Sequence, residues 1–222
     1  MDNFNLRNVA KGGKTSGKIP MDVYMIEKYL KHKKNGVFIE AGGFDGVFQS
    51  NTYVLEKYYN WSGIIVEPAF NQYVRCKKNR NVNIYNVALV PFDYNKDTIC
   101  GDFEDGSPFS SINGVRSSSK QLIEVKAVTL QSILDERNIT KVDFFSLDVE
   151  GYELSVLKGI DFEKIKFEFI LIEFNPTKID ELMAFMSERN YEFLENVSNY
   201  TKETNPQWDG LHNDYLFQYI HQ

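Results

Sequence analysis

The segment FIEAGGFDG, residues 38–46, places three glycines directly after a short apolar stretch. Glycine is costly to order, but it allows backbone conformations and close approaches that a Cβ atom forbids. A glycine cluster behind a buried strand therefore predicts a turn that something approaches closely. The rest of the chain indicates what that could be.

Apolar strands alternate with helical segments along most of the chain. The predicted strands are residues 37–41, 63–68, 82–90, 122–128, 142–151 with their turn, 168–176, 191–196 and 214–220. Helices are predicted from Pro20 to before Gly36 and at 50–59, 69–78, 129–137, 152–159 and 178–189. This alternation is typical of a parallel sheet covered on both faces, so we predict a doubly wound α/β fold of the nucleotide-binding type. The last two strands have no helix between them and should pair antiparallel at the sheet edge.

The composition favours one large domain. The chain has 222 residues, of which 42% are hydrophobic, and this suffices for one core. We expect a flexible N-terminal arm at 1–18 and a single domain at 19–222, with an insertion at 91–121 that forms a lid over the active site. A net charge of -6 argues against a nucleic-acid partner. Two cysteines, no apolar signal segment and no long apolar run predict a cytoplasmic protein without a membrane span.

The fold class predicts where a ligand binds. In doubly wound sheets, ligands lie outside the carboxyl ends of the strands, where the strand order reverses. This rule selects residues 40–51, 67–70, 86–92, 148–152 and 173–176, each of which carries a carboxylate, an Asn or a Gly. These strand ends are the predicted site.

The glycine turn does not fit a dinucleotide. The dinucleotide motif reads G-x-G-x-x-G, and its second glycine lets the backbone approach a pyrophosphate. Phe44 stands in that position and would obstruct a pyrophosphate. S-adenosylmethionine has none, so it is the predicted cofactor. The alternative is an ordinary strand–helix turn with a capping aspartate.

Residues around the turn could bind each part of S-adenosylmethionine. Glu40 and Asp45 could bind its amine, directly or through water. Backbone N–H groups of the glycine turn, with Ser50 and Asn51 at a helix N-terminus, could bind its carboxylate. Glu67 ends the second strand, where a carboxylate accepts both ribose hydroxyls.

Four segments together resemble the FkbM family of S-adenosylmethionine-dependent methyltransferases. They are FIEAGGFDGVFQSNTYVLEKYYNWSGIIVEP (38–68), FFSLDVEGYELSVLKG (144–159), ILIEFNP (170–176) and NDYLFQYI (213–220). The resemblance implies a Rossmann-like class I methyltransferase with a mostly parallel seven-stranded sheet, strand order 3-2-1-4-5-7-6 and an antiparallel last strand. It also implies methylation of a hydroxyl, often on a sugar of a glycan or glycoconjugate. The cofactor-binding residues that it implies are Glu40, Gly42, Gly43, Asp45, Ser50, Asn51, Glu67, Asn86, Val87, Ala88 and Asp148.

A sugar hydroxyl is a poor nucleophile, so the reaction needs a general base or a metal ion. Asp148 ends the fourth strand of the expected sheet, and Glu173 and Asn175 end the fifth. These oxygen ligands would suit Mg²⁺ or Mn²⁺. Without a metal, Asp148 or Glu173 is the expected base. His212, just before the last strand, is a further candidate base.

Other functions remain open at this point. A non-catalytic FkbM-like binding module would keep the fold, but such modules are expected to lose the strand-end carboxylates that this chain retains. An NAD(P)-dependent oxidoreductase is disfavoured by Phe44. An RNA 2′-O-methyltransferase is disfavoured by the acidic balance of the chain. The expected partner is a carbohydrate or another small acceptor with a hydroxyl group, and the oligomeric state is left open.

Overall fold

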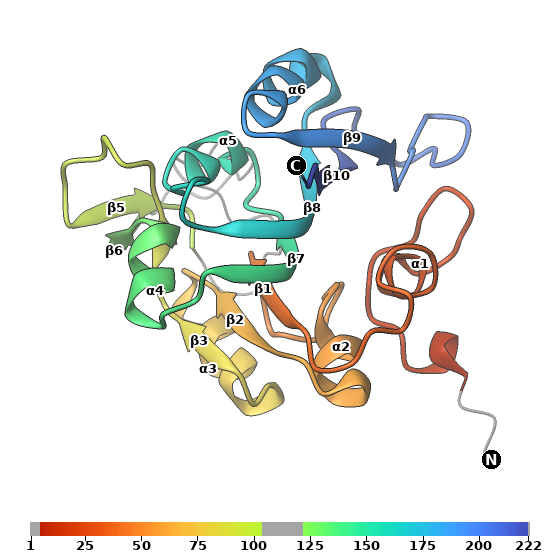
Figure 1. The fold of residues 1–222 in the computed structure, drawn as a ribbon, viewed down its shortest axis with the longest axis horizontal. Coiled ribbons are helices and arrows are strands. Elements are labelled where there is room, and N and C mark those ends of the chain that lie inside the picture. Colours follow the sequence, from red (N-terminus) through yellow and green to blue (C-terminus); the bar gives the residue numbers. More distant parts are fainter. Residues whose placement is uncertain (1–4, 104–121, 222) are drawn as a thin grey trace.

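The computed structural model describes residues 5–103 and 122–221. Its main sheet has seven strands in the order β3-β2-β1-β7-β8-β10-β9 (Figure 1). These strands are β1 (Val37–Ala41), β2 (Ser62–Val66), β3 (Asn83–Tyr85), β7 (Lys141–Leu147), β8 (Lys166–Phe174), β9 (Tyr191–Asn196) and β10 (Asn213–Tyr219). Counted along the chain within this sheet, the order is 3-2-1-4-5-7-6, as the family resemblance implies. β10 pairs antiparallel with both β8 and β9, and the other neighbours are parallel.

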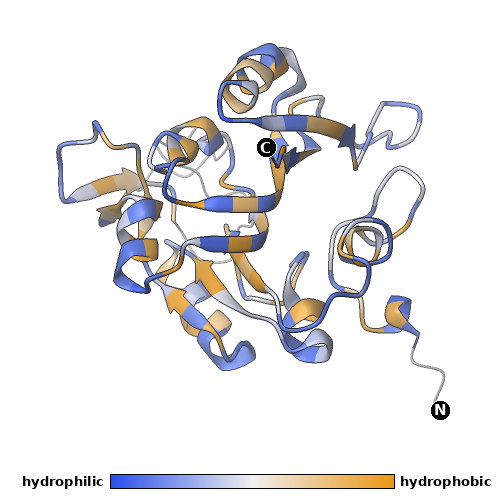
Figure 2. Ribbon diagram, in the orientation of Figure 1, coloured by the Kyte–Doolittle hydropathy of each residue, from blue (hydrophilic) through white to orange (hydrophobic). Residues whose placement is uncertain are grey.

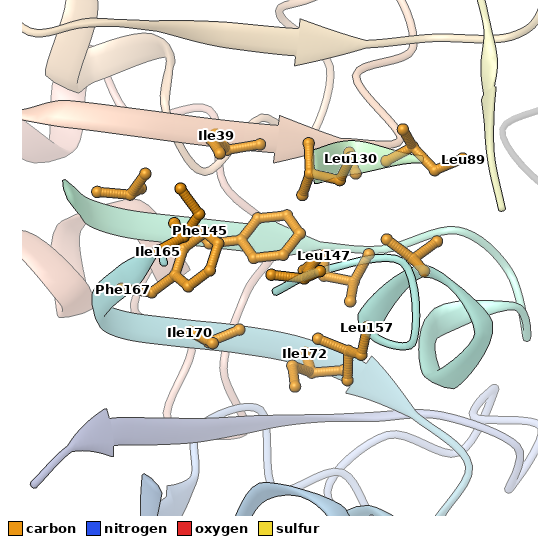
Figure 3. Close-up of a cluster of buried hydrophobic side chains, with 14 of the residues drawn as sticks. Ile39, Leu89, Leu130, Phe145, Leu147, Leu157, Ile165, Phe167, Ile170 and Ile172 are labelled. Carbon is orange, nitrogen blue, oxygen red and sulfur yellow. The ribbon is translucent and has the colours of Figure 1, made fainter. Parts of the chain in front are cut away.

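Helices cover both faces of the sheet because successive strand residues point to opposite sides. Ile39, Phe145 and Ile170 face α4 (Leu130–Glu136), α5 (Glu153–Leu157) and α6 (Ile179–Ser187) in one buried cluster (Figure 3). Phe38 and Phe144 face α1 (Met21–Lys28), α2 (Tyr53–Tyr59) and α3 (Phe70–Asn79) in the other. The helices carry hydrophobic and hydrophilic residues side by side (Figure 2), which fits one face in the core and one in solvent. The predicted doubly wound fold is therefore confirmed.

The predicted strand at 82–90 is divided between two sheets. Its first part is β3, whereas β4 (Ala88–Leu89) joins β5 (Thr98–Gly101) and β6 (Ile123–Val128) in a three-stranded sheet. The division falls at Asn86, whose side chain donates to the carbonyls of Glu67 and Pro68. β5 lies in the segment predicted as an insertion, so part of that segment is regular structure. Residues 104–121 of the expected lid lie outside the described residues.

The N-terminal segment differs from the flexible arm that we expected. Between residues 5 and 18 it contains a short helix, η1 (Leu6–Asn8), with Leu6 buried in the second core cluster. The amide of Lys11 donates to the buried Asp22 carboxylate at 2.7 Å, and the amide of Ser16 donates to Ser198 O at 2.7 Å. Figure 1 shows this segment beside the loop between β9 and β10. It is therefore fixed by hydrogen bonds to partners far along the chain, which its polar composition does not reveal.

Among the described residues, none of the helices combines the length and the hydropathy needed to cross a lipid bilayer.

Candidate active site

Two adjoining cavities lie at the carboxyl ends of the central strands. A narrow apolar cavity and a polar cavity of about 420 Å³ share Ala41, Gly42, Phe44, Asp148 and Glu150 in their walls. The apolar cavity is also lined by Val66, Glu67, Val87, Ala88, Leu89 and Phe103. The polar cavity is also lined by Glu40, Gly43, Ser50, Asn51, Glu173, His212 and Asp214. The strand-end rule thus brings most of the predicted site residues together.

The groups that approach the glycine turn closely are other parts of the protein and not a ligand. Gly42 has φ +87°, and a Cβ atom there would lie 1.7 Å from the backbone oxygen of Asp148. A Cβ atom on Gly43 would lie 2.1 Å from Cγ2 of Ile65. The amides of Gly42 and Gly43 both donate to Val66 O, at 3.0 and 3.1 Å. These two N–H groups, which we expected to bind the cofactor carboxylate, are engaged within the fold.

Replacing Gly42 with alanine is expected to destabilise the protein more than replacing Gly151 does. Both glycines have positive φ, +87° and +97°, so each alanine introduces backbone strain of about 1–3 kcal/mol. Only the Cβ at position 42 would collide with backbone, because a Cβ at Gly151 meets nothing within 4 Å. Urea unfolding measures both losses of stability. Equal losses would contradict the close-approach explanation.

Glu67 lies in the wall of the apolar cavity and is almost fully buried, at 5% exposure. Its two carboxylate oxygens accept from the amides of Phe44 (2.7 Å) and Ala69 (2.8 Å). Burial raises the pKa of Glu67 to about 7, although both amides act in the opposite direction. A carboxylate offers about four acceptor positions, and the two amides occupy two of them. Glu67 can therefore accept two further hydrogen bonds from a ligand.

Glu40 lines the polar cavity, but other protein groups surround its carboxylate. It accepts from Ser50 Oγ, from Thr52 Oγ1 at 2.7 Å and from the amide of Asn51 at 2.9 Å. It also faces the guanidinium of Arg80, which the sequence analysis did not identify. Asn51 Nδ2 donates to Ser146 Oγ, whereas its buried Oδ1 atom has no hydrogen-bond partner. Asn51 lines this cavity, but its Oδ1 atom is itself buried.

Asp45 and Asn86 have local roles. The Asp45 carboxylate accepts from the amides of Val47 (2.8 Å) and Phe48 (2.7 Å), as the capping alternative predicted. Asn86 fixes the end of β2 through two backbone carbonyls. Neither residue lines the two cavities among the described residues.

Three carboxylates meet at the ends of β7 and β8. One oxygen of each of Asp148, Glu150 and Glu173 lies within 4.8 Å of the others. Burial and then the charge of Asp148 raise the pKa of Glu173 well above its ordinary value, with further contributions from Asp214 and Glu150. The neighbouring Glu153 is buried and accepts from the amides of Val149 and Gly151, so it holds the turn between β7 and α5.

Asn175 turns away from this group. Its Oδ1 atom accepts from the amide and the hydroxyl of Thr177, at 2.9 and 2.8 Å, and caps the short helix η2 (Pro176–Lys178). Asn175 lines a neighbouring cavity instead. The local turn uses the amide oxygen that we expected to bind a metal ion.

Asp214 is a site residue that the sequence analysis missed. It pairs with Glu173 in the register of β10 with β8, and it lines the polar cavity. Burial and the charge of Asp148 raise its pKa to about 7. The only sequence signal was an acidic residue at the start of the last predicted strand, which faces the site because β10 runs antiparallel.

His212 reaches the polar cavity, as expected. Its Nδ1 atom lies 3.1 Å from Asp209 Oδ1 but without hydrogen-bond geometry. The indole of Trp208 donates to the backbone carbonyl of His212 and fixes this loop. His212 also lines the neighbouring cavity, so it stands between the two.

Comparison with known proteins identifies the family of this chain. The model of the methyltransferase FkbM domain matches residues 40–193. No curated protein matches the chain. The crystal structure of methyltransferase FkbM from Methylobacillus flagellatus KT is similar with a TM-score of 0.53 at 14% identity, over 90% of this chain and 48% of that one. The METTL16 MTase domain is similar with a TM-score of 0.50 at 8% identity, over 91% and 67%. This chain thus spans about half of the M. flagellatus protein, and these similarities show the fold alone.

Proposed function

The chain belongs to the FkbM methyltransferase family, and we propose that it transfers the methyl group of S-adenosylmethionine to a hydroxyl of a sugar unit in a glycan or glycoconjugate. The observation that carries this proposal is the pair of adjoining cavities: one is apolar with a buried carboxylate, and the other is polar with several. The boundary between them, at Gly42, Phe44 and Asp148, is where the methyl group would be transferred.

The adenosine part of the cofactor suits the apolar cavity. Val87, Ala88 and Phe103 offer apolar contacts for adenine. The two remaining acceptor positions of Glu67 match the two ribose hydroxyls. In the polar cavity, the amino-acid part would lie against Ser50 and Asn51, which line its wall.

The acceptor hydroxyl would approach the methyl group through the polar cavity, from the side opposite the sulfur atom. Methyl transfer is an in-line displacement, in which the O–CH₃ bond forms as the S–CH₃ bond breaks. The hydroxyl proton must leave, and Asp148, Glu173 and His212 all line the cavity where it would be released. Asp148 borders both cavities, as Glu150 does, and its amide is bound to Ala41 O at the end of β1. Asp148 is therefore the proposed general base, with Glu173 and His212 as alternatives.

A divalent cation fits the three neighbouring carboxylates. Their oxygens are the hard ligands that Mg²⁺ and Mn²⁺ prefer, and they lie close enough to share one ion. Asp148, Glu150 and Glu173 would hold it, with Glu150 in the place that we expected Asn175 to take. A cation bound there would increase the acidity of a hydroxyl that contacts it.

The neighbouring cavity, which Asn175 and His212 line, supports an acceptor larger than one sugar. It has a volume of about 450 Å³ and shares Glu150, Glu173 and His212 with the polar cavity. Leu154 and Leu211 offer apolar contacts there, and Lys158 and Lys178 offer donors. Further units of a glycan would extend into this space. The described lining of the polar cavity contains no lysine or arginine, which disfavours an RNA acceptor.

Calorimetry should show binding of S-adenosylhomocysteine and no binding of NAD⁺. Phe44 stands where the dinucleotide motif has the glycine that lets the backbone approach a pyrophosphate, and its amide donates to Glu67. Methyl transfer to a sugar would then be followed by mass spectrometry, as a gain of one CH₂ unit in the acceptor. Cofactor binding without transfer to any saccharide would favour the non-catalytic binding module, and NAD⁺ binding would contradict the proposal.

A further inference from the structure

Arg80 directly follows α3, and its side chain is completely buried, at 0% exposure. Its Nη1 group donates to Gly46 O (2.9 Å), Ser50 Oγ (3.1 Å) and Glu40 Oε2 (3.3 Å). Its Nη2 group donates to Thr52 Oγ1 (2.9 Å), and its Nε group donates to Glu56. The guanidinium is thus bonded to β1, to α2 and to the middle and the second end of the loop between them.

The charge of Arg80 is balanced within this group. A buried charge is tolerated only when it is paired and its donors are satisfied. Glu40 and Glu56 supply two nearly buried carboxylates, and Lys57 pairs with Glu56 at 2.8 Å. The four side chains together carry no net charge. The network therefore neutralises Glu40, which makes this carboxylate a poor partner for the ammonium group of the cofactor.

The same network determines where Asn51 points. Glu40 accepts from the amide of Asn51, and Ser146 accepts from its Nδ2 group. These bonds hold Asn51, which lines the polar cavity, in a fixed position in the cavity wall. Arg80 holds the residues on both sides of Asn51, Ser50 and Thr52.

We propose that Arg80 is a positioning residue for the methionine part of the cofactor. Its guanidinium fixes Glu40 and the loop 46–52, so that Ser50 and Asn51 keep the shape of the cavity wall against which the amino-acid part of the cofactor would lie. The inference rests on the proposed function and goes beyond it, because it assigns the order of this loop to a residue outside the described lining of the apolar and polar cavities. Glu40 acts through the loop rather than on the cofactor.

Lysine cannot replace Arg80 in this role. The guanidinium carries five donors in a rigid planar fork, whereas an ammonium group is a compact charge with three. Lysine would keep the positive charge near Glu40 but could not bond to Glu56, Gly46 and Thr52 at once. Arg80→Lys therefore tests the geometry of the fork with little change in charge.

The experiment compares two ligands by calorimetry. S-adenosylhomocysteine contains the amino-acid part, and 5′-methylthioadenosine lacks it. Arg80→Lys should weaken binding of S-adenosylhomocysteine by about tenfold or more and leave binding of 5′-methylthioadenosine unchanged, because one charge-assisted hydrogen bond is misplaced. The matched control is Asp143→Asn, which breaks a buried contact to Lys33 and to the amide of Val37 away from the cavities. This control should destabilise the fold and bind both ligands as the wild type does.

A second variant covers the case in which Arg80→Lys does not fold. Thr52→Val removes one hydroxyl of the network and lies outside both cavities. Thr52→Val should also weaken binding of S-adenosylhomocysteine selectively, but by a smaller factor than Arg80→Lys. An equal loss for both ligands, or no loss, would overturn the inference and leave the proposed function intact. A wild-type protein that binds neither ligand would overturn both.

Discussion

Methyl transfer is expected to fall by about a hundredfold to ten-thousandfold when Asp148 is replaced with asparagine, which is the usual contribution of a general base. Asp148 directly follows β7, and its amide donates to Ala41 O at the end of β1, so its position between the two cavities is fixed by the backbone. Asparagine keeps the shape but cannot take a proton. The initial rate measures the loss, and calorimetry with S-adenosylhomocysteine should show intact cofactor binding. Asp135→Asn, on the exposed side of α4, is the matched control and should keep full activity.

Chelation separates a metal ligand from a base, because Asp148→Asn is inactive in both cases. If Asp148, Glu150 and Glu173 hold a cation, EDTA should abolish turnover, and Mg²⁺ or Mn²⁺ should restore it. Cofactor affinity should not change. Glu150→Gln should then raise the metal concentration needed for half-maximal activity. Full activity in EDTA would exclude the metal and leave Asp148, Glu173 or His212 as the base.

Replacing Glu67 with alanine is expected to weaken binding of S-adenosylhomocysteine by at least tenfold. The carboxylate would lose two hydrogen bonds from the ribose, and bonds to a charged group are worth about 1.5–3 kcal/mol each. Titration calorimetry at pH 8 measures the loss directly. Undiminished affinity would mean that the ribose lies elsewhere.

Binding should also depend on pH through Glu67. Burial raises the pKa of Glu67 to about 7, and ribose hydroxyls that donate to the carboxylate favour its ionised form. Below pH 7 the free protein must first release a proton, so affinity should fall by up to about tenfold per pH unit. Glu67→Ala should bind weakly with a flat dependence over this range. Burial likewise raises the pKa of Glu153 and of Asp214 to about 7, so a slope that persists in the variant would come from those groups.

The same raised pKa has a consequence for folding. The folded state holds the Glu67 proton more tightly than the unfolded state, so the protonated form favours folding at low pH. This contribution is complete below the ordinary value of 4.5 and is lost as the pH rises toward about 7. Ligand affinity and this part of the stability therefore change in opposite directions with pH.

The sequence by itself determined the sheet and the place of the site. Residues such as Phe144 and Phe145 alternate between the two faces of a strand, and this period identifies a strand covered on both sides. Because the carboxyl ends of parallel strands meet at one edge, Glu40, Glu67, Asp148 and Glu173 could be placed together before any contact was known. The location of each carboxylate in the site follows from its position relative to its own strand.

Only the tertiary structure decided the contacts between distant segments. Arg80 meets Glu40 because α3 packs beside the glycine turn, and Asp214 meets Glu173 because of the register of β10 with β8. The N-terminal segment is fixed by Asp22 and Ser198, which its polar composition does not predict. The spacing of apolar residues in the sequence indicates which face of a helix or strand is buried. The contacts between distant residues depend instead on how whole elements pack against one another. Asn175 shows the reverse: a local turn uses its amide oxygen, so its position at a strand end did not decide its role.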